Sequence, residues 1–368
     1  WEKDPISLAN REDIDVFIEL IGGHEGAAKD AVEIAISRGK NVITANKALL
    51  AHHGHKLALK AEENGSILRF EAAVAGGIPV IKALTEGLAG NSINRIMGVM
   101  NGTCNYILTR MESSGLSYEE VFSEANELGY LEADPNLDIG GIDAAHKLSI
   151  LSSIAFGTEI NFDGIEIEGI DKITINDIHQ AADMGFRIKL LGVSQMTCRG
   201  LEQKMSPCLV PTTSPLGQLE GGTNMIVIEG DQVGQIVLRG AGAGEGPTSS
   251  AVIADIMDLA RGISVAPFGQ PAKTLMKTSS SKSQTPAPYY LRMLLHDEPG
   301  ALAKITKILS QFNVSIDRMR QYGHEDENAP VLIVTHEISH EDLMTAIKEL
   351  PKTKVLKAQP LAIRIEAV

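Results

Sequence analysis

The sequence predicts an α/β protein with a doubly wound parallel sheet, a following α+β region and a small C-terminal unit of the ferredoxin-like split pattern. Three observations support this prediction. Apolar runs alternate with amphipathic helical segments over the first 80 residues, helices mix with amphipathic strands over residues 81–241, and a Ser/Thr/Pro-rich stretch precedes a β-α-β-β-α-β pattern. Because 43% of the 368 residues are hydrophobic, the chain can fill more than one core.

The N-terminal elements are expected in the order β-α-β-α-β. The first strand is an almost continuous apolar run, which is typical of burial on both faces of a parallel sheet. Gly39 stands where the first helix should end in a left-handed cap. In chain order, the expected strands and helices cover residues 14–21, 26–39, 41–44, 46–63 and 67–74.

Small, polar or glycine-rich segments follow these three strands, at residues 22–23, 44–47 and 71–79. Ligands of a doubly wound sheet bind beyond the carboxyl ends of its strands, so the three segments predict a binding site. Tight turns between strands and helices explain the same composition and are the alternative.

Further along the chain, strands are expected at residues 91–99, 225–230 and 234–240, and a helix at 142–156. Residues 277–288 carry four Ser, two Thr and two Pro, which is typical of a flexible tether. The C-terminal unit that follows should contain strands and helices over residues 290–295, 301–312, 315–321, 331–338, 341–350 and 361–365.

Charge and cysteine content exclude several classes of protein. The 33 Lys+Arg against 47 Asp+Glu give a net charge of −14, which argues against binding to nucleic-acid phosphates. No window holds the ~18 to 20 unbroken apolar residues of a membrane span. Cys104, Cys198 and Cys208 match neither a zinc motif nor a disulfide framework. We expect a cytoplasmic protein that binds small molecules, not nucleic acid or membranes.

An acidic segment, residues 129–151, carries the strongest signal for chemistry. Asp143 and Lys147 are four residues apart on an expected helix, and Lys147 shares its face with apolar residues that should point inward. A partly buried ammonium beside a carboxylate can donate a proton. An ordinary surface ion pair has the same spacing, and the residues alone leave both interpretations open. A calcium loop is excluded because Ile139 occupies its obligatory glycine position.

A glycine-rich loop at residues 239–246 precedes a helix expected to start at Pro247. Its backbone N–H groups could approach a phosphate or a flat ring, although such loops are more often simple turns. No G-x-G-x-x-G sequence lies between a strand and a helix near the N-terminus, although the βαβ pattern calls for one.

Six motifs, in order over nearly the whole chain, together resemble homoserine dehydrogenase. They are IELIGG (18–23), VITANKALLA (42–51), FEAAVAGGIPVI (70–81), MNGTCNYIL (100–108), GYLEADPNLDIGGIDAAHKL (129–148) and GAGEGPTSSAV (242–252). The block from Glu132 to Lys147 is the most specific. The resemblance implies NAD(P)-dependent interconversion of L-aspartate 4-semialdehyde and L-homoserine, a step toward threonine, methionine and isoleucine.

The resemblance implies roles for individual residues. Lys147 would be the acid/base that protonates the aldehyde oxygen, and Lys47, near the nicotinamide, would assist it. Glu132 and Asp143 would hold the amino end of the substrate, with Asp138 nearby.

Family members also bind a nicotinamide cofactor and a sodium ion. The matching cofactor contacts are Gly22, Lys47, Gly242 and Gly244. The matching cation ligands are the carboxylate of Glu71 and the backbone carbonyls of Val74, Gly76 and Ile78.

The implied domains are a Rossmann-like NAD(P)-binding domain at 1–80 to which 242–268 return, a catalytic and dimerisation domain at 81–241, a linker at 269–288, and a regulatory domain at 289–368. The last resembles an ACT domain, with Asp297, Pro299 and Gly300 in its DxPG pattern. It implies feedback regulation by a bound amino acid, threonine, in a homodimer or homotetramer. An ACT domain used only for assembly is the alternative.

The absent glycine fingerprint leads to two further expectations. The family's first strand, its glycine-rich turn and the next helix and strand should precede Trp1, so the parallel sheet is expected to be incomplete. The alternative function is a catalytically incompetent fragment that serves as an amino-acid-binding or assembly module.

Overall fold

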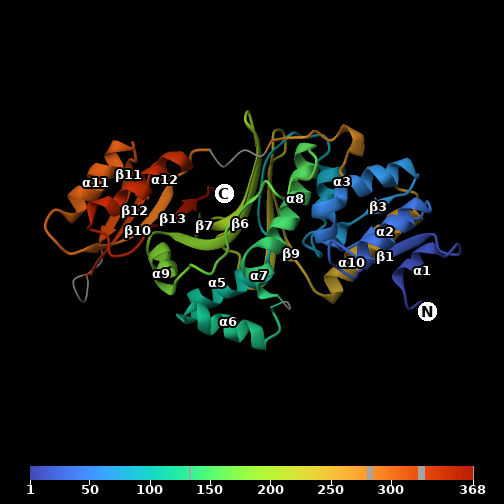
Figure 1. The fold of residues 1–368 in the computed structure, drawn as a ribbon, viewed down its shortest axis with the longest axis horizontal. Helices are drawn as coiled ribbons and strands as arrows, with labels where there is room; N and C mark the ends of the chain where they lie inside the picture. The colour runs from blue at the N-terminus through green and yellow to red at the C-terminus, as the bar shows by residue number, and fades with distance from the viewer. Residues whose placement is uncertain (132–133, 280–284, 322–327, 368) are drawn as a thin grey trace. The chain divides into compact units, whose positions relative to one another are not determined.

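The computed structural model describes residues 1–131, 134–279, 285–321 and 328–367, and the protein divides into two compact units (Figure 1). Unit 1 comprises residues 1–179, 190–206 and 218–282, and unit 2 comprises residues 180–189, 207–217 and 283–368. Strands β6 (Phe186–Thr197) and β7 (Gly200–Pro211) contribute residues to both units. Among the described residues, no helix combines the length and the apolar character needed to cross a membrane.

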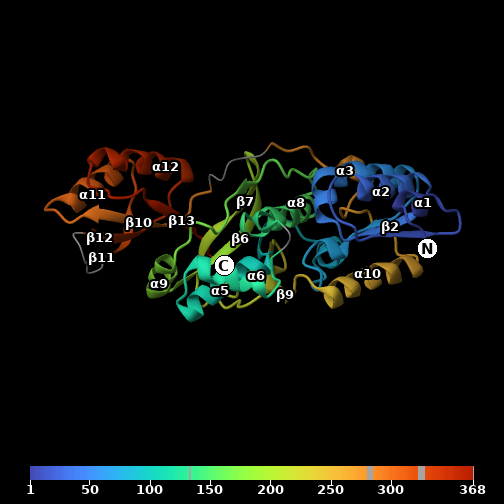
Figure 2. The same ribbon diagram turned by 60° about the horizontal axis from the view of Figure 1, so that its bottom comes forward.

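A three-stranded parallel sheet forms the N-terminal part of unit 1. Its strands β1 (Val16–Glu19), β2 (Asn41–Thr44) and β3 (Leu68–Arg69) lie side by side in chain order. Figure 2 shows helices on both of its faces, with α1 (Pro5–Asn10), α2 (Ala27–Ser37) and α3 (Lys47–Glu63) on one and α10 (Glu245–Ala260) on the other. The parallel α/β arrangement predicted from the alternation of elements is confirmed.

The third strand is shorter than the sequence predicted. Pairing with β2 stops at Arg69, and the chain then forms the 3₁₀ helix η1 (Glu71–Ala73) instead of remaining extended to residue 74. The backbone N–H of Glu71 donates to Oδ2 of Asp255 (3.0 Å), and Ala75 has a left-handed backbone with φ of 53°. The apolar run predicts a longer strand, but most of these residues are buried by packing against α10, not by strand pairing.

The rest of unit 1 is an α+β layer. Strand β4 (Ile93–Val99) pairs antiparallel with β6 and with β8 (Thr223–Gly230), β8 pairs antiparallel with β9 (Gly234–Ala241), and β5 (Glu166–Ile167) pairs parallel with β7. The other helical segments described up to residue 279 are α4 (Val80–Lys82), the π-helical turn η2 (Ala83–Gly87), α5 (Gly102–Ser114), α6 (Tyr118–Glu127), α7 (Pro135–Ile139), α8 (Ile142–Phe156), α9 (Ile175–Asp183), whose last four residues belong to unit 2, and η3 (Ala272–Thr274).

Two helices in this layer position the site. Helix α8 has the predicted bounds and packs against β4 and α3. Helix α10 begins at Glu245, two residues before the predicted start, after Gly244 with φ of 114°. Pro247 therefore lies in the first helical turn, where its missing N–H costs no hydrogen bond.

The predicted linker is only partly described, because residues 280–284 lie outside the described residues. Before them, the backbone N–H of Met276 donates to the carbonyl of Gly157 (2.9 Å), and that of Leu201 donates to the carbonyl of Ser279 (3.2 Å). Ala272 is buried. Residues 271–279 thus belong to unit 1 and contact the rest of it, which composition alone does not reveal.

The C-terminal part of unit 2 has the predicted β-α-β-β-α-β order. Its elements are β10 (Tyr289–His296), α11 (Ala301–Gln311), β11 (Ile316–Gln321), β12 (Asn328–Thr335), α12 (His340–Glu349), η4 (Leu350–Thr353) and β13 (Leu361–Ile365). The antiparallel strand order β11-β12-β10-β13 confirms the ferredoxin-like prediction. Leu291, Ile305, Ile333 and Leu343 are fully buried between the sheet and the helices.

Candidate active site

A pocket of about 400 Å³ in unit 1 brings together residues from distant parts of the chain. Six residues predicted for catalysis, substrate or cofactor line it, namely Lys47, Asp138, Asp143, Lys147, Gly242 and Gly244. Gly22 is not among the lining residues. Glu132, the remaining predicted substrate contact, lies outside the described residues.

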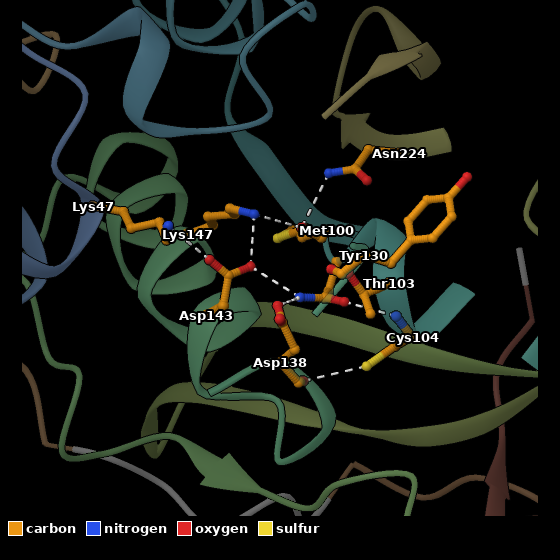
Figure 3. Close-up of polar contacts among 10 residues, drawn as sticks. Lys47, Met100, Thr103, Cys104, Tyr130, Asp138, Asp143, Lys147 and Asn224 are labelled. Carbon is orange, nitrogen blue, oxygen red and sulfur yellow. Dashed lines mark hydrogen bonds and ion pairs between the residues drawn. The ribbon is translucent and has the colours of Figure 1, made fainter. Parts of the chain in front are cut away.

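Asp143, on α8, lies between two lysines (Figure 3). Its Oδ2 accepts a hydrogen bond from Nζ of Lys147 at 2.7 Å, and its Oδ1 lies 3.0 Å from Nζ of Lys47 at the start of α3. The Lys147 ammonium also donates to the backbone carbonyl of Met100 at 2.9 Å. The side chains of Lys147 and Asp143 are only 9% and 7% exposed. This burial excludes the ordinary surface ion pair that the sequence left open.

The two ammonium groups keep Asp143 ionised. Burial by itself would raise the pKa of the Asp143 carboxyl, but the charges of Lys147 and Lys47 outweigh it and hold that pKa well below its usual range. The carboxylate therefore stays negative throughout the neutral range and is a constant counter-charge for both lysines.

Asn101 joins the two pocket carboxylates. It caps the N-terminus of α5, where its Oδ1 accepts from the backbone N–H of Cys104 (2.8 Å). Its Nδ2 donates to Oδ1 of Asp138 (2.8 Å) and to Oδ2 of Asp143 (3.1 Å). Because the helix cap fixes the amide, the positions of both carboxylates are fixed as well.

Asn224, on β8, connects the glycine-rich loop to Lys147. Its Nδ2 donates to the carbonyl of Met100 (3.0 Å), the same oxygen that accepts from Lys147 (Figure 3). The backbone of Gly242 lies so close to the Asn224 amide that a Cβ at position 242 would overlap it. Gly242 is therefore required for close packing of the loop against the residues that hold Lys147.

Aromatic and imidazole rings pack behind the site, where α3 meets α8. The ring of His146, next to Lys147, lies 5.6 Å from the ring of His52 and 4.5 Å from that of Phe162 between centroids. Burial, with a smaller effect of His52, lowers the pKa of His146 to about 4. His146 is therefore neutral at physiological pH and adds no third positive charge beside the two lysines.

The predicted cation ligands lie on a different segment, between β3 and α4. Glu71 is 3% exposed, and its carboxylate accepts from the backbone N–H groups of Ile81 (3.0 Å) and Lys82 (2.9 Å). Burial raises the pKa of Glu71 to about 7 in spite of these hydrogen bonds. The N–H of Gly77 donates to the carbonyl of Ala241 (2.9 Å), so this segment supports the glycine-rich loop.

In unit 2, the predicted effector residues lie at the start of α11. A second pocket, of about 340 Å³, is lined there by Asp297, Gly300 and the first turn of the helix, together with His296 and Gln321. Pro299 is not among its lining residues. The N-terminal N–H groups of a helix favour an anionic ligand such as a carboxylate.

Sequence reasoning missed several residues of the main pocket. Asn101, Thr103 and Tyr130 line it, although the motifs that contain them predict no individual role for these residues. Asn224 was missed altogether, although one polar residue on the buried face of an otherwise apolar strand is a usable signal.

The parallel sheet and the pocket indicate a dehydrogenase. A sheet with helices on both faces lies in the same unit as a pocket lined by a glycine-rich loop and a buried lysine, and this combination is typical of nicotinamide-dependent dehydrogenases. Comparison with known proteins supplies the family. Residues 3–71 match the model described as "Homoserine dehydrogenase, NAD binding domain", residues 79–257 match "Homoserine dehydrogenase", and residues 289–352 match "ACT domain".

Similar proteins span almost all of the chain. Homoserine dehydrogenase of Neisseria gonorrhoeae is 43% identical over an alignment of 374 positions, which covers 100% of this chain and 86% of that protein. The Pseudomonas aeruginosa enzyme is 41% identical over 99% of this chain and 86% of its own length. The crystal structure of a homoserine dehydrogenase from Thiobacillus denitrificans is 40% identical, with a TM-score of 0.94 over 99% of this chain and 85% of that one.

The chain belongs to the homoserine dehydrogenase family. It is an oxidoreductase that acts on a CH–OH group with a nicotinamide cofactor, and its role in amino-acid biosynthesis follows from that activity. The alternative of an inactive binding module is not favoured.

Proposed function

We propose that the 400 Å³ pocket is the site of hydride transfer between L-aspartate 4-semialdehyde and L-homoserine, with Lys147 as the acid/base. The observation that supports this best is the buried ammonium of Lys147, held by Asp143 and the Met100 carbonyl in a pocket that also contains the glycine-rich loop. Turnover of the semialdehyde with NADPH or NADH by the wild type and by Lys147→Met tests the proposal. An inactive binding module would show no turnover in either protein.

Lys147 carries the proton chemistry in this proposal. An ammonium has three N–H groups, and its two described partners use two of them. The third donates to the aldehyde oxygen as negative charge develops there, and Lys147 takes the proton back in the reverse direction. Lys47, whose side chain is 32% exposed, stabilises the same oxygen from the cofactor side.

The carboxylates provide the complementary contacts. Asp138 and Asp143, with Glu132, hold the ammonium of the substrate, because a cation entering a buried pocket needs negative partners. Asn101 fixes both aspartates, so this subsite exists before the substrate arrives.

The cofactor side of the pocket is formed by backbone. Gly242 and Gly244 line it, and Gly22 follows β1 at the end of the parallel sheet. A nicotinamide, NADP or NAD, supplies or receives the hydride when bound. A hyperthermophilic archaeal homoserine dehydrogenase, 29% identical with a TM-score of 0.62, has been determined in complex with NADPH, which favours NADPH as the first cofactor to test.

We further propose that a sodium ion binds at Glu71 with the carbonyls of Val74, Gly76 and Ile78. These are hard oxygen donors of the kind that such cations prefer. The carbonyls of Val74 and Gly76 accept no hydrogen bond from any described residue, and burial destabilises the Glu71 carboxylate. A cation there would compensate the buried charge and stiffen the segment beneath the glycine-rich loop.

Sodium chloride is expected to raise the thermal unfolding temperature above that in tetramethylammonium chloride of equal ionic strength. Binding requires the ionised carboxyl, so sodium affinity should rise as pH increases through about 7, the pKa of Glu71. Glu71→Gln should abolish the difference between the two salts, and Glu86→Gln, at an exposed carboxyl nearby, should preserve it. Equal melting of the wild type in both salts at pH 8 would contradict the cation site.

The pocket at α11 is proposed to bind an amino-acid effector, with threonine the first candidate. Its carboxylate would lie at the start of the helix, beside Gly300. ACT domains often bind effectors where two of them pair, and we therefore also propose that the protein is a homodimer or homotetramer.

Threonine is expected to inhibit the wild type, and Ala303→Glu is expected to weaken this inhibition by about ten-fold or more in concentration. Ala303 is exposed and lines the pocket, so the added carboxylate repels the ligand without disturbing the core. Ser310→Glu places the same charge at the other end of α11 and should leave inhibition unchanged. If threonine inhibits Ala303→Glu and the wild type equally, the effector binds elsewhere.

A further inference from the structure

The carboxylate of Glu19, at the end of β1, is completely buried, and no described cation pairs with it. Its Oε1 accepts from the backbone N–H groups of Ile21 (2.7 Å) and Gly22 (2.9 Å), and its Oε2 accepts from the hydroxyl of Thr44 (2.5 Å). A buried carboxylate held only by neutral donors is costly, and an apolar side chain at this fully buried position would cost less. The position of Glu19 therefore calls for an explanation beyond stability.

The loop above Glu19 is shaped by these hydrogen bonds. Gly22 and Gly23 are both left-handed, with φ of 88° and 82°, and both are exposed. A Cβ at Gly22 would meet nothing within 4 Å, so glycine is required there by the backbone conformation and not by lack of space. The buried carboxylate of Glu19 thus holds the backbone of the Gly22 loop in one conformation while the loop itself stays exposed, which is what contact with a ligand requires.

The same carboxylate is linked to the neighbouring strand end. The Thr44 hydroxyl that donates to Glu19 accepts from the backbone N–H of Asn46 (3.0 Å), and the Asn46 side chain donates to the carbonyl of Gly23 (2.7 Å). The Asn46 Oδ1 also caps α3 at the N–H of Leu49 (3.0 Å). The hydrogen bonds thus form a closed ring that fixes the two segments, 21–23 and 44–46, to each other.

Asn46, a member of this ring, directly precedes Lys47, whose Nζ lies 3.0 Å from Oδ1 of Asp143 in the pocket. We propose that Glu19 is a positioning residue for the nicotinamide cofactor: it holds the Gly22 loop and the turn that carries Lys47 as a single preformed surface. This inference rests on the proposed cofactor contacts of Gly22 and Lys47. It adds that neither segment keeps its shape without the buried carboxylate between them.

The test compares Glu19→Ala with Glu19→Gln. The single oxygen of Gln can accept from both Ile21 and Gly22, and its amide can donate to the Thr44 hydroxyl, so the isosteric variant retains the ring. Alanine removes all three acceptor contacts. Glu19→Ala also leaves a cavity and unpaired donors, so it should unfold at a lower temperature than Glu19→Gln, and NADPH affinity is compared at a temperature at which circular dichroism shows both variants folded.

Affinity is measured by the fluorescence of bound NADPH, without turnover. The Kd is expected to rise by about ten-fold or more in Glu19→Ala and to stay within about three-fold of the wild type in Glu19→Gln, while the KM for the semialdehyde changes by less than about two-fold. Thr44→Val, which breaks the ring from the other strand, should weaken binding as well. Glu63→Gln, at an exposed carboxyl of α3, is the control that should bind normally.

Two results would overturn the inference. Unchanged affinity in Glu19→Ala would show that the loop holds its shape unaided. An equal loss of NADPH affinity in Glu19→Ala and Glu19→Gln would show that the charge of Glu19 matters and that its hydrogen-bond geometry does not. Lys47→Met separates these results from a failure of the proposed function: if it impairs turnover while Glu19→Ala binds NADPH normally, the assignment of the pocket stands and the role of Glu19 does not.

Discussion

Lys147→Met should lower kcat by about 10³-fold or more while the affinity for NADPH stays close to that of the wild type. Methionine has nearly the length of lysine but offers no proton, so the oxyanion formed by hydride arrival stays uncompensated at this position. Asp143 keeps Lys47 as its partner at 3.0 Å, so the buried carboxylate is not left alone and the protein should fold. The decisive measurements are single-turnover rates of NADPH oxidation and the Kd from NADPH fluorescence.

Lys172→Met is the matched control for this variant. Lys172 also pairs with an acidic residue four positions away, Glu168, but at 3.6 Å with both side chains about half exposed or more. Exposed pairs of this kind contribute little to stability, so activity and melting temperature should remain near the wild type. Turnover of Lys147→Met within about ten-fold of the wild type would remove Lys147 from the proton transfer and favour Lys47 or solvent as the donor.

Asp143→Asn should damage both stability and catalysis, which distinguishes it from Lys147→Met. The substitution removes the charge shared by Lys147 and Lys47 and places an amide N–H₂ near two ammonium groups. Breaking a buried ion pair by removing one partner costs about 3 to 5 kcal/mol, and the free energy of unfolding at pH 7 should fall by an amount of that order. The kcat should fall by about 10²-fold or more, since the lysine that donates the proton is no longer held in place.

The pH dependence of unfolding provides a second check on Asp143. Because its pKa is held below that of an unfolded aspartate, the carboxylate stabilises the native state above about pH 4, and this contribution is lost as pH falls toward the folded pKa. The difference in stability between the wild type and Asp143→Asn should therefore shrink on acidification. Asp30→Asn, at an exposed position of α2, should differ little from the wild type at any pH. Wild-type stability and turnover in Asp143→Asn would show that the lysines do not depend on this carboxylate.

Periodicity located most elements but misjudged the burial of the first strand: β1 spans only Val16–Glu19 of the predicted residues 14–21, and Ile18, Leu20 and Ile21 are exposed, not buried. Helix α8 and strand β2 have the predicted bounds, and the order of the C-terminal unit is as predicted. It failed at Phe70–Val74, where an apolar run is buried by α10 from far along the chain. An apolar run indicates that its residues are buried. It does not show whether they form a paired strand or an irregular turn packed under a helix.

The parallel α/β order, the ferredoxin-like C-terminal unit and the pairing of Asp143 with Lys147 can all be predicted from the sequence, because each depends on spacing along a single element or on the succession of neighbouring elements. The folded structure was needed to show that Lys47 shares Asp143, that Asn101 and Asn224 hold the pocket in place, and that Glu19 lies beneath the Gly22 loop. The partners in the first two cases are up to 124 residues apart. Such contacts depend on how strands and helices pack. Packing also buries Lys147 and Asp143, whose i, i+4 spacing is equally common in ion pairs on protein surfaces.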